Sequence, residues 1–120
     1  MKNIITNMKK SYIIGAVILL VVIGGSFVVY EHSPTAKYKK GLHYYKEKNY
    51  KKALPLFEEA AKHNYAPAEE KLGYMYLKGW GVPQHTDKAV YWFKKAAKQG
   101  NAKAKANLEH LELARLFGGY

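Results

Sequence analysis

The chain of 120 residues contains no cysteine, one aspartate and one arginine. Without cysteine it can form neither a disulfide framework nor a thiolate zinc site, and it has no cysteine nucleophile or lipidation site. Its only serines, Ser11, Ser26 and Ser33, all precede the part of the chain that has a helical pattern. Covalent catalysis by serine or cysteine in that part is therefore excluded.

Groups for metal binding or acid–base chemistry are also sparse. The four histidines after residue 35 are scattered, and no two have the spacing of metal ligands on one helix face: His43, His63, His85 and His110. The acidic pairs at 58–59 and 69–70 are neighbours in sequence, and we interpret both as solvent-exposed. We predict no catalytic residue, no metal site and no cofactor, and hence no enzyme.

Charge is absent from one long stretch, residues 12–30, because all 20 basic and 9 acidic residues lie outside it. As a helix this stretch would reach about 28 Å, close to the ~30 Å thickness of bilayer hydrocarbon. A cleaved signal peptide is the alternative, but its apolar core is about 7–15 residues long and ends at a small-residue cleavage site, which residues 28–32 do not provide. We predict an uncleaved transmembrane anchor after a basic tail at 1–11.

The flanking charges indicate an orientation. Lys9 and Lys10 precede the apolar stretch and Glu31 and His32 follow it, which favours a cytoplasmic amino terminus. Further lysines at 37–40 oppose this asymmetry. We predict a single-pass protein of a bacterial inner membrane, with its carboxyl-terminal domain on the periplasmic side. Residues 31–35 are predicted to be a linker, with Pro34 stopping helix continuation.

Residues 36–120 show little strand alternation, and their apolar residues recur at intervals of three and four. This pattern predicts an all-α domain with helices at 36–47, 50–63, 66–78, 86–98 and 102–116. The chain also repeats itself. Ala53, Phe57, Ala60 and Ala61 recur 36 residues later as Ala89, Phe93, Ala96 and Ala97, while Gly41 and Tyr44 recur 32 residues later as Gly73 and Tyr76. We predict a short α-solenoid of two helix pairs and a closing helix.

Small and aromatic residues at the repeated positions indicate packing. Gly41 and Gly73 would each cost up to about 1 kcal/mol in a helix relative to alanine, so we expect close helix contacts there. The predicted aromatic core consists of Tyr44, Tyr76, Tyr91, Trp92, Phe57 and Phe93. Because about three units are usually needed for a stable solenoid, we expect a domain that is marginally stable or dependent on a partner.

These motifs resemble a known family. The segments LGYMYLKGWGV at 72–82 and DKAVYWFKKAAKQGNAKAKANL at 87–108 resemble a Sel1-like repeat, and residues 41–68 are similar to both Sel1-like and tetratricopeptide units. The resemblance covers 36 to about 114 and implies adaptor, regulatory or assembly roles. Two features depart from it. His85 stands where the family usually has an acidic residue, so we expect Thr86 to cap the helix. Glu109 and Glu112 replace the Gly and Tyr of the repeat, as suits a solvent-facing terminal helix.

By analogy with tetratricopeptide grooves, the first helix of each pair lines a concave binding face. The predicted protein-binding groove comprises Tyr38, Leu42, Tyr45, Tyr74, Leu77, Lys78 and His110, together with Ala106 and Leu113. Tyrosine supplies large contact area and a hydrogen-bonding tip, which suits protein recognition.

The net charge of +11 allows an anionic partner. Lysines near the predicted anchor form a candidate basic patch: Lys37, Lys39, Lys40, Lys51 and Lys52. This patch is interpreted as a solvated face, with anionic lipid headgroups as the alternative partner; nucleic acid is not expected. The sequence thus predicts a membrane-anchored adaptor that binds a cell-envelope protein. An immunity protein that occludes a secreted antibacterial toxin is the alternative, and a polyanion-binding module the third reading.

Overall fold

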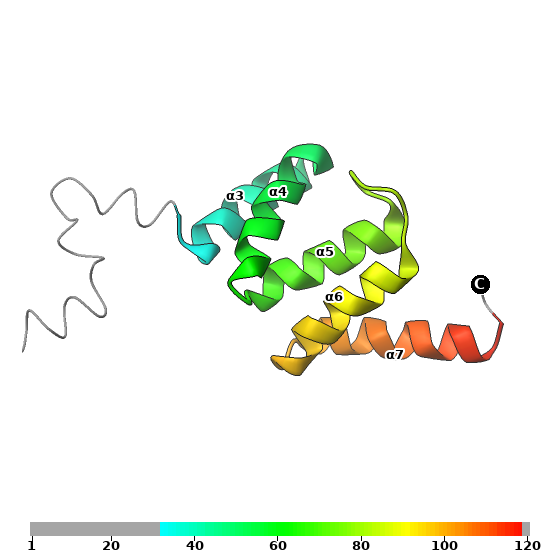
Figure 1. Cartoon of the computed structure of the whole chain (residues 1–120). Coiled ribbons are helices and arrows are strands. Elements are labelled where there is room, and N and C mark those ends of the chain that lie inside the picture. Colours follow the sequence, from blue (N-terminus) through cyan, green and yellow to red (C-terminus); the bar gives the residue numbers. More distant parts are fainter. Residues whose placement is uncertain (1–31, 119–120) are drawn as a thin grey trace, which may run out of the picture.

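A computed structural model describes residues 32–118, which form five α-helices and no β-strand (Figure 1). In chain order the helices are α3 (Pro34–Lys46), α4 (Tyr50–Lys62), α5 (Ala66–Lys78), α6 (Thr86–Lys98) and α7 (Ala102–Leu116). The predicted tail at 1–11 and transmembrane helix at 12–30 lie outside the described residues. From residue 32 to residue 118, no helix is long and apolar enough to cross a bilayer.

Helix α3 begins earlier than the sequence predicts. Pro34 occupies its first turn, and the Ser33 hydroxyl accepts a hydrogen bond from the Ala36 N–H at 3.1 Å. Proline is well suited to this position because the first N–H groups of a helix have no partner within the helix. Pro34 and Thr35 therefore belong to the helix, and the predicted linker at 31–35 is too long by these two residues.

Helix α6 is capped by His85 rather than by the predicted Thr86. The His85 Nδ1 atom accepts a hydrogen bond from the Lys88 N–H at 3.2 Å, and Thr86 is the first helical residue. An unprotonated imidazole nitrogen can accept a bond at this position much as a carboxylate oxygen would. The expectation of a Thr86 cap is wrong because it did not count histidine among the capping side chains.

Each helix pair is held by the same contact between a glycine and a phenylalanine. A Cβ atom added at Gly41 would lie 2.8 Å from Phe57 Cε1, and one added at Gly73 would lie 2.5 Å from Phe93 Cε1. Both phenylalanines are fully buried. A methyl group does not fit in either place, which explains why the repeated positions carry glycine despite its cost in a helix.

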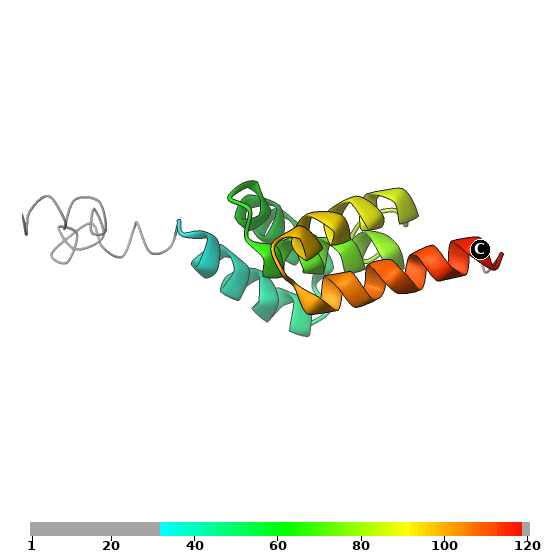
Figure 2. The ribbon, with the colours of Figure 1, turned by 90° about the horizontal axis from the view of Figure 1, so that it is seen from below.

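The buried residues form two clusters, one between α4 and α5 and the other between α6 and α7. The first cluster contains Ala53, Phe57, Ala60, Ala61, Ala68, Leu72 and Met75. The second contains Ala89, Phe93, Ala96, Ala104 and Leu111. Helix α7 contributes Ala104 and Leu111 to the second cluster and extends beyond the second pair (Figure 2). The predicted two pairs with a closing helix are therefore the observed arrangement.

One aromatic residue of the predicted core lies elsewhere. Phe57 and Phe93 are fully buried, while Tyr44, Tyr76 and Trp92 are half-buried. Tyr91 is 55% exposed, so the prediction that it belongs to the core is wrong. It lies on the outer face of α6, at the position that exposed Pro55 takes in α4, 36 residues earlier.

Candidate functional site

The three helices α3, α5 and α7 share one hollowed face. One hollow of about 560 Å³ is lined by Tyr45, Glu70, Lys71, Tyr74, Lys78, Trp80, Lys103, Ala106 and Asn107. A second, of about 460 Å³, is lined by Tyr74, Leu77, Lys78, Gln84, Asn107, His110 and Leu111. Because Tyr74, Lys78 and Asn107 line both hollows, we treat them as one surface and call it the α3–α5–α7 groove.

Most residues predicted for a groove meet here. Tyr45, Tyr74, Leu77, Lys78, Ala106 and His110 all line the α3–α5–α7 groove. Tyr38, Leu42 and Leu113 do not. Tyr38 lies two turns before Tyr45 in α3, and its ring contacts Phe57 at 5.7 Å and Tyr65 at 5.3 Å between centroids. Burial there raises the pKa of Tyr38, and its ring belongs to the packing of the first pair.

Aromatic rings close one end of the groove. The Tyr45 ring meets Tyr50 edge-on at 5.3 Å and Trp80 at 5.9 Å, while Tyr50 and Trp80 stack at 5.0 Å with an interplanar angle of 6°. Trp80 comes from the α5–α6 loop. That loop can approach the Tyr50 backbone closely because residue 81 is glycine. A Cβ atom added at Gly81 would lie only 2.9 Å from the Tyr50 carbonyl carbon. Burial raises the pKa of Tyr45 to about 12.

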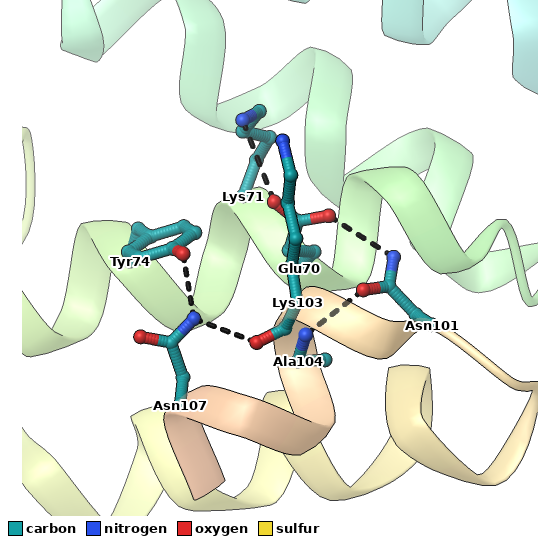
Figure 3. Close-up of polar contacts among 7 residues, drawn as sticks. All are labelled: Glu70, Lys71, Tyr74, Asn101, Lys103, Ala104 and Asn107. Carbon is teal, nitrogen blue, oxygen red and sulfur yellow. Dashed lines mark hydrogen bonds and ion pairs between the residues drawn. The ribbon is translucent and has the colours of Figure 1, made fainter. Parts of the chain in front are cut away.

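Helix α7, the opposite wall, is positioned by hydrogen bonds from α5 (Figure 3). Glu70 Oε2 accepts a bond from Asn101 Nδ2 at 3.0 Å, and Asn101 Oδ1 caps α7 by accepting one from the Ala104 N–H at 2.9 Å. Asn107 Nδ2 donates to Tyr74 Oη at 2.6 Å and to the Lys103 carbonyl at 2.8 Å. The groove therefore depends on polar contacts between residues about 30 positions apart.

The neighbouring carboxylate strengthens this attachment. Glu69 is fully buried, and its Oε2 accepts a hydrogen bond from Gln99 Nε2 at 2.7 Å in the α6–α7 turn. Its Oε1 has no hydrogen bond and lies 3.6 Å from Lys95 Nζ. The prediction that residues 69–70 are solvent-exposed is therefore wrong, because the α6–α7 turn covers the start of α5. The helix dipole also favours an acidic residue in this first turn.

The groove carries more positive than negative charge. Lys71 Nζ lies 3.6 Å from Glu70 Oε1 and above the rings of Tyr45 and Tyr74, at 5.4 and 5.7 Å from their centroids. Lys78 and Lys103 are exposed, and within residues 32–118 neither side chain forms an ion pair. The single groove carboxylate, Glu70, is already engaged by Asn101 and Lys71.

The predicted basic patch is spread along the α3–α4 hairpin. Lys52 Nζ lies 5.5 Å from the Tyr44 ring centroid, near the turn between the helices. Lys37, at the start of α3, is near Glu59, whose pKa is lowered mainly by a hydrogen bond from Lys62 and to a smaller degree by Lys37. The helices are antiparallel and roughly 20 Å long, so Lys37 and Lys52 lie near opposite ends of the hairpin. Lys39, Lys40 and Lys51 are exposed.

The groove offers several kinds of binding group. Its side chains provide ammonium and phenol donors, an amide acceptor and aromatic surface. Among the described residues, no group of three or more histidine, aspartate or glutamate side chains is placed to hold a metal ion.

A known protein family matches the two helix pairs. The sequence model of the family described as Sel1 repeat matches residues 36–65 and again 66–101, which is more than half of the chain. The first match covers α3 and α4, and the second covers α5, α6 and the turn before α7. Among curated proteins, no sequence matches the chain.

Proposed function

Because the chain belongs to the Sel1 repeat family, whose repeats commonly mediate protein–protein interactions, we propose that it is a binding module that presents the α3–α5–α7 groove to a partner protein. The observation that carries this proposal is the groove itself. Three helices contribute to it, and it combines aromatic surface from Tyr45, Tyr74 and Trp80 with the unpaired cations Lys78 and Lys103. Aromatic anchors surrounded by polar groups are typical of protein-binding surfaces.

The groove is formed before any partner binds. Its α3 and α5 walls are fixed by the contacts of Gly41 with Phe57 and of Gly73 with Phe93. Its α7 wall is fixed by the hydrogen bonds of Glu70 and Asn107. A preorganised surface has less conformational entropy to lose on binding, which supports a role as a rigid adaptor or scaffold.

The proposal also places the module at a membrane. The apolar stretch at 12–30 would anchor the chain in a bacterial inner membrane, with the helical domain on the periplasmic side. Confinement to the membrane would raise the effective concentration of the groove toward envelope partners. Fusions of alkaline phosphatase and of green fluorescent protein after Tyr120 test the orientation. We expect phosphatase activity without fluorescence, and the reverse result would overturn the periplasmic placement.

Partner binding is tested by affinity purification of the full chain from its own cells in detergent. We expect the retained protein to be lost when Tyr45 or Tyr74 is changed to alanine. Tyr91→Ala is the matched control, because Tyr91 is exposed but does not line the groove. Loss of the partner with Tyr91→Ala, or its retention by both groove variants, would contradict the proposal. The identity of the partner would also separate an adaptor from an immunity protein.

A further inference from the structure

We propose that the segment bound in the α3–α5–α7 groove is an extended acidic peptide of the partner protein, with its carboxylates contacting Lys71, Lys78 and Lys103. This inference rests on the proposed function and adds the chemistry of the partner.

The charges that line the groove are unbalanced. Three ammonium groups and one carboxylate line the first hollow of the groove. The carboxylate, Glu70, accepts a hydrogen bond from Asn101 and is paired with Lys71, whereas Lys78 and Lys103 form no ion pair in the described part of the chain. Figure 3 shows the Lys103 side chain extending from α7 toward α5. Lys78 on α5 and Lys103 on α7, neither of which has a counterion in the described part of the chain, are complementary to the carboxylates of a segment bound in this hollow.

Lys71 is held in a fixed position within the groove. Its side chain is 19% exposed, and its ammonium group is held at the groove floor by Glu70 and by the faces of Tyr45 and Tyr74. A lysine fixed in this way loses little rotamer entropy when it binds an anion. A carboxylate beside it would be partly shielded from water, where a charge-assisted hydrogen bond is stronger than at the open surface.

Two hydrogen-bonding groups of the groove remain available to the backbone of a bound peptide. Both amide hydrogens of Asn107 are used, by Tyr74 Oη and by the Lys103 carbonyl, which leaves its Oδ1 as an acceptor. Tyr74 accepts that bond, so its own hydroxyl hydrogen remains available as a donor. The Asn107 acceptor on α7 and the Tyr74 donor on α5 match the N–H and C=O groups of an extended peptide. A peptide backbone offers an N–H donor to Asn107 Oδ1 at every residue except proline, whereas a phosphodiester backbone offers none.

Aromatic surface lies at one end of the groove. Tyr45 and Trp80 line the groove next to Lys71 and Lys78. Rings of this kind bind apolar or aromatic side chains and gain contact area at low entropic cost. We therefore expect the acidic residues of the bound segment to alternate with, or to flank, at least one large apolar side chain.

The experiment is a selection of random displayed peptides on the full chain in detergent micelles. We expect the selected peptides to be enriched in aspartate and glutamate beside an aromatic or large aliphatic residue. The tightest peptide is then synthesised, and its binding is measured by fluorescence anisotropy. A second version, in which each Asp becomes Asn and each Glu becomes Gln, should bind at least about tenfold more weakly, because it loses the charged contacts.

Variants of the protein locate the contact. Lys78→Gln and Lys103→Gln should each weaken binding of the selected peptide by about five- to tenfold, since each removes a direct ion pair. Lys39→Gln and Lys51→Gln remove the same charge from exposed positions outside the groove and should change binding by less than about twofold.

The other outcomes contradict distinct claims. The selection could yield peptides that lack acidic residues and that bind through Tyr74 but are insensitive to Lys78→Gln and Lys103→Gln. That result would overturn the proposal that the bound segment is acidic and would leave the proposed function intact. Vesicles of anionic phospholipid or single-stranded RNA that compete as well as the acidic peptide would also overturn it. A selection that yields no peptide sensitive to Tyr45→Ala, Tyr74→Ala or the two lysine variants would contradict the groove as a binding surface and with it the proposed function.

Discussion

Both junctions between successive helix units bury an apolar cluster, but the contacts around the two clusters use different chemistry. At the first junction, the α5–α6 loop of the second pair covers the first pair through the stacked rings of Tyr50 and Trp80 and the edge contact of Tyr45. At the second junction, α7 is attached to α5 by the hydrogen bonds that Asn101 donates to Glu70 and Asn107 donates to Tyr74.

The difference shows which parts of the repeat are fixed and which can vary. Within each pair the contact between glycine and phenylalanine is the same. The contacts around the buried clusters at the two junctions differ, because they are aromatic in one case and polar in the other. The polar junction leaves a cleft of about 240 Å³ between α6 and α7, lined by Val90 and Leu111 among others. Beyond it, Leu116 and Phe117 are 79% and 83% exposed. The position of α7, and so the shape of the groove, depends on its hydrogen bonds to α5 together with the packing of Ala104 and Leu111 against α6.

The largest expected effect concerns the shared contact within the pairs. Gly73→Ala should lower the free energy of unfolding by about 1–3 kcal/mol, because the new methyl group overlaps the Phe93 ring. Gly41→Ala should behave in the same way with a smaller loss, since its overlap with Phe57 is smaller. Urea denaturation followed by circular dichroism measures both values. Combining Gly73→Ala with Phe93→Leu should cost less than the sum of the single changes.

Gly100→Ala is the control for this experiment. Gly100 has a φ of 89°, and no atom lies within 4 Å of an added Cβ, so the change tests backbone strain without a clash. It should cost about 1 kcal/mol. A loss for Gly73→Ala no greater than that for Gly100→Ala would contradict the role assigned to the contact between glycine and phenylalanine.

The second prediction breaks the polar junction alone. Glu70→Ala should cost about 1–3 kcal/mol, because Asn101 loses its acceptor in a part-buried position. Hydrogen exchange should show the loss of protection in α7, with α3 and α4 unchanged. Glu70→Gln retains an oxygen that can accept from Asn101, so most of the protection should remain. Equal loss of protection in all five helices would show that the two junctions are not separable.

The third prediction concerns the unusual cap of α6. His85→Asp should raise the stability by about 0.5–1 kcal/mol, because a carboxylate accepts the Lys88 N–H and also favours the helix amino terminus. His85→Ala should lower the stability by a similar amount. Thermal unfolding of the unchanged protein, His85→Asp and His85→Ala gives their order of stability. Identical melting temperatures would contradict the assigned cap.

The smallest effect is at alkaline pH and reports on the aromatic junction. Tyr45 has a folded-state pKa of about 12, above the ordinary tyrosine value of about 10. The unfolded chain therefore releases this proton first. The contribution of Tyr45 to stability is complete below about pH 10 and is lost as the pH rises toward 12. Urea unfolding across this window should show the fall, and Tyr45→Phe should reduce it. An unchanged fall in the variant would exclude Tyr45 as its cause.

The local parts of the fold could be predicted from the sequence. The spacing of apolar residues placed the helices within two residues of their ends, and the recurrence of Gly41 and Phe57 as Gly73 and Phe93 identified the pairs. Tyr45, Tyr74 and Lys78 could be placed in a groove because they lie on the first helix of a pair. Tyr91 could have been recognised as exposed from its register with Pro55.

The remaining groove residues could not be predicted, because their positions depend on contacts between distant segments. Trp80 reaches the groove only because its loop folds over Tyr50. Lys103 and Asn107 reach it because Asn101 donates a hydrogen bond to Glu70 at the start of α7 and because Ala104 and Leu111 pack in the second cluster. A single sequence gives no sign of such a bond, since a buried glutamate and an exposed one have the same local pattern.

The most direct test of the central claim is photocrosslinking from inside and outside the groove in living cells. Benzoylphenylalanine would replace His110, which is exposed and lines the groove, or Tyr91, which is exposed on the outer face of α6. We predict that the His110 position yields a covalent adduct with an acidic segment of another protein, that Lys78→Gln with Lys103→Gln abolishes it, and that the Tyr91 position yields none. Adducts from Tyr91 at the same yield, or none from His110, would contradict the assignment of the groove as the binding surface.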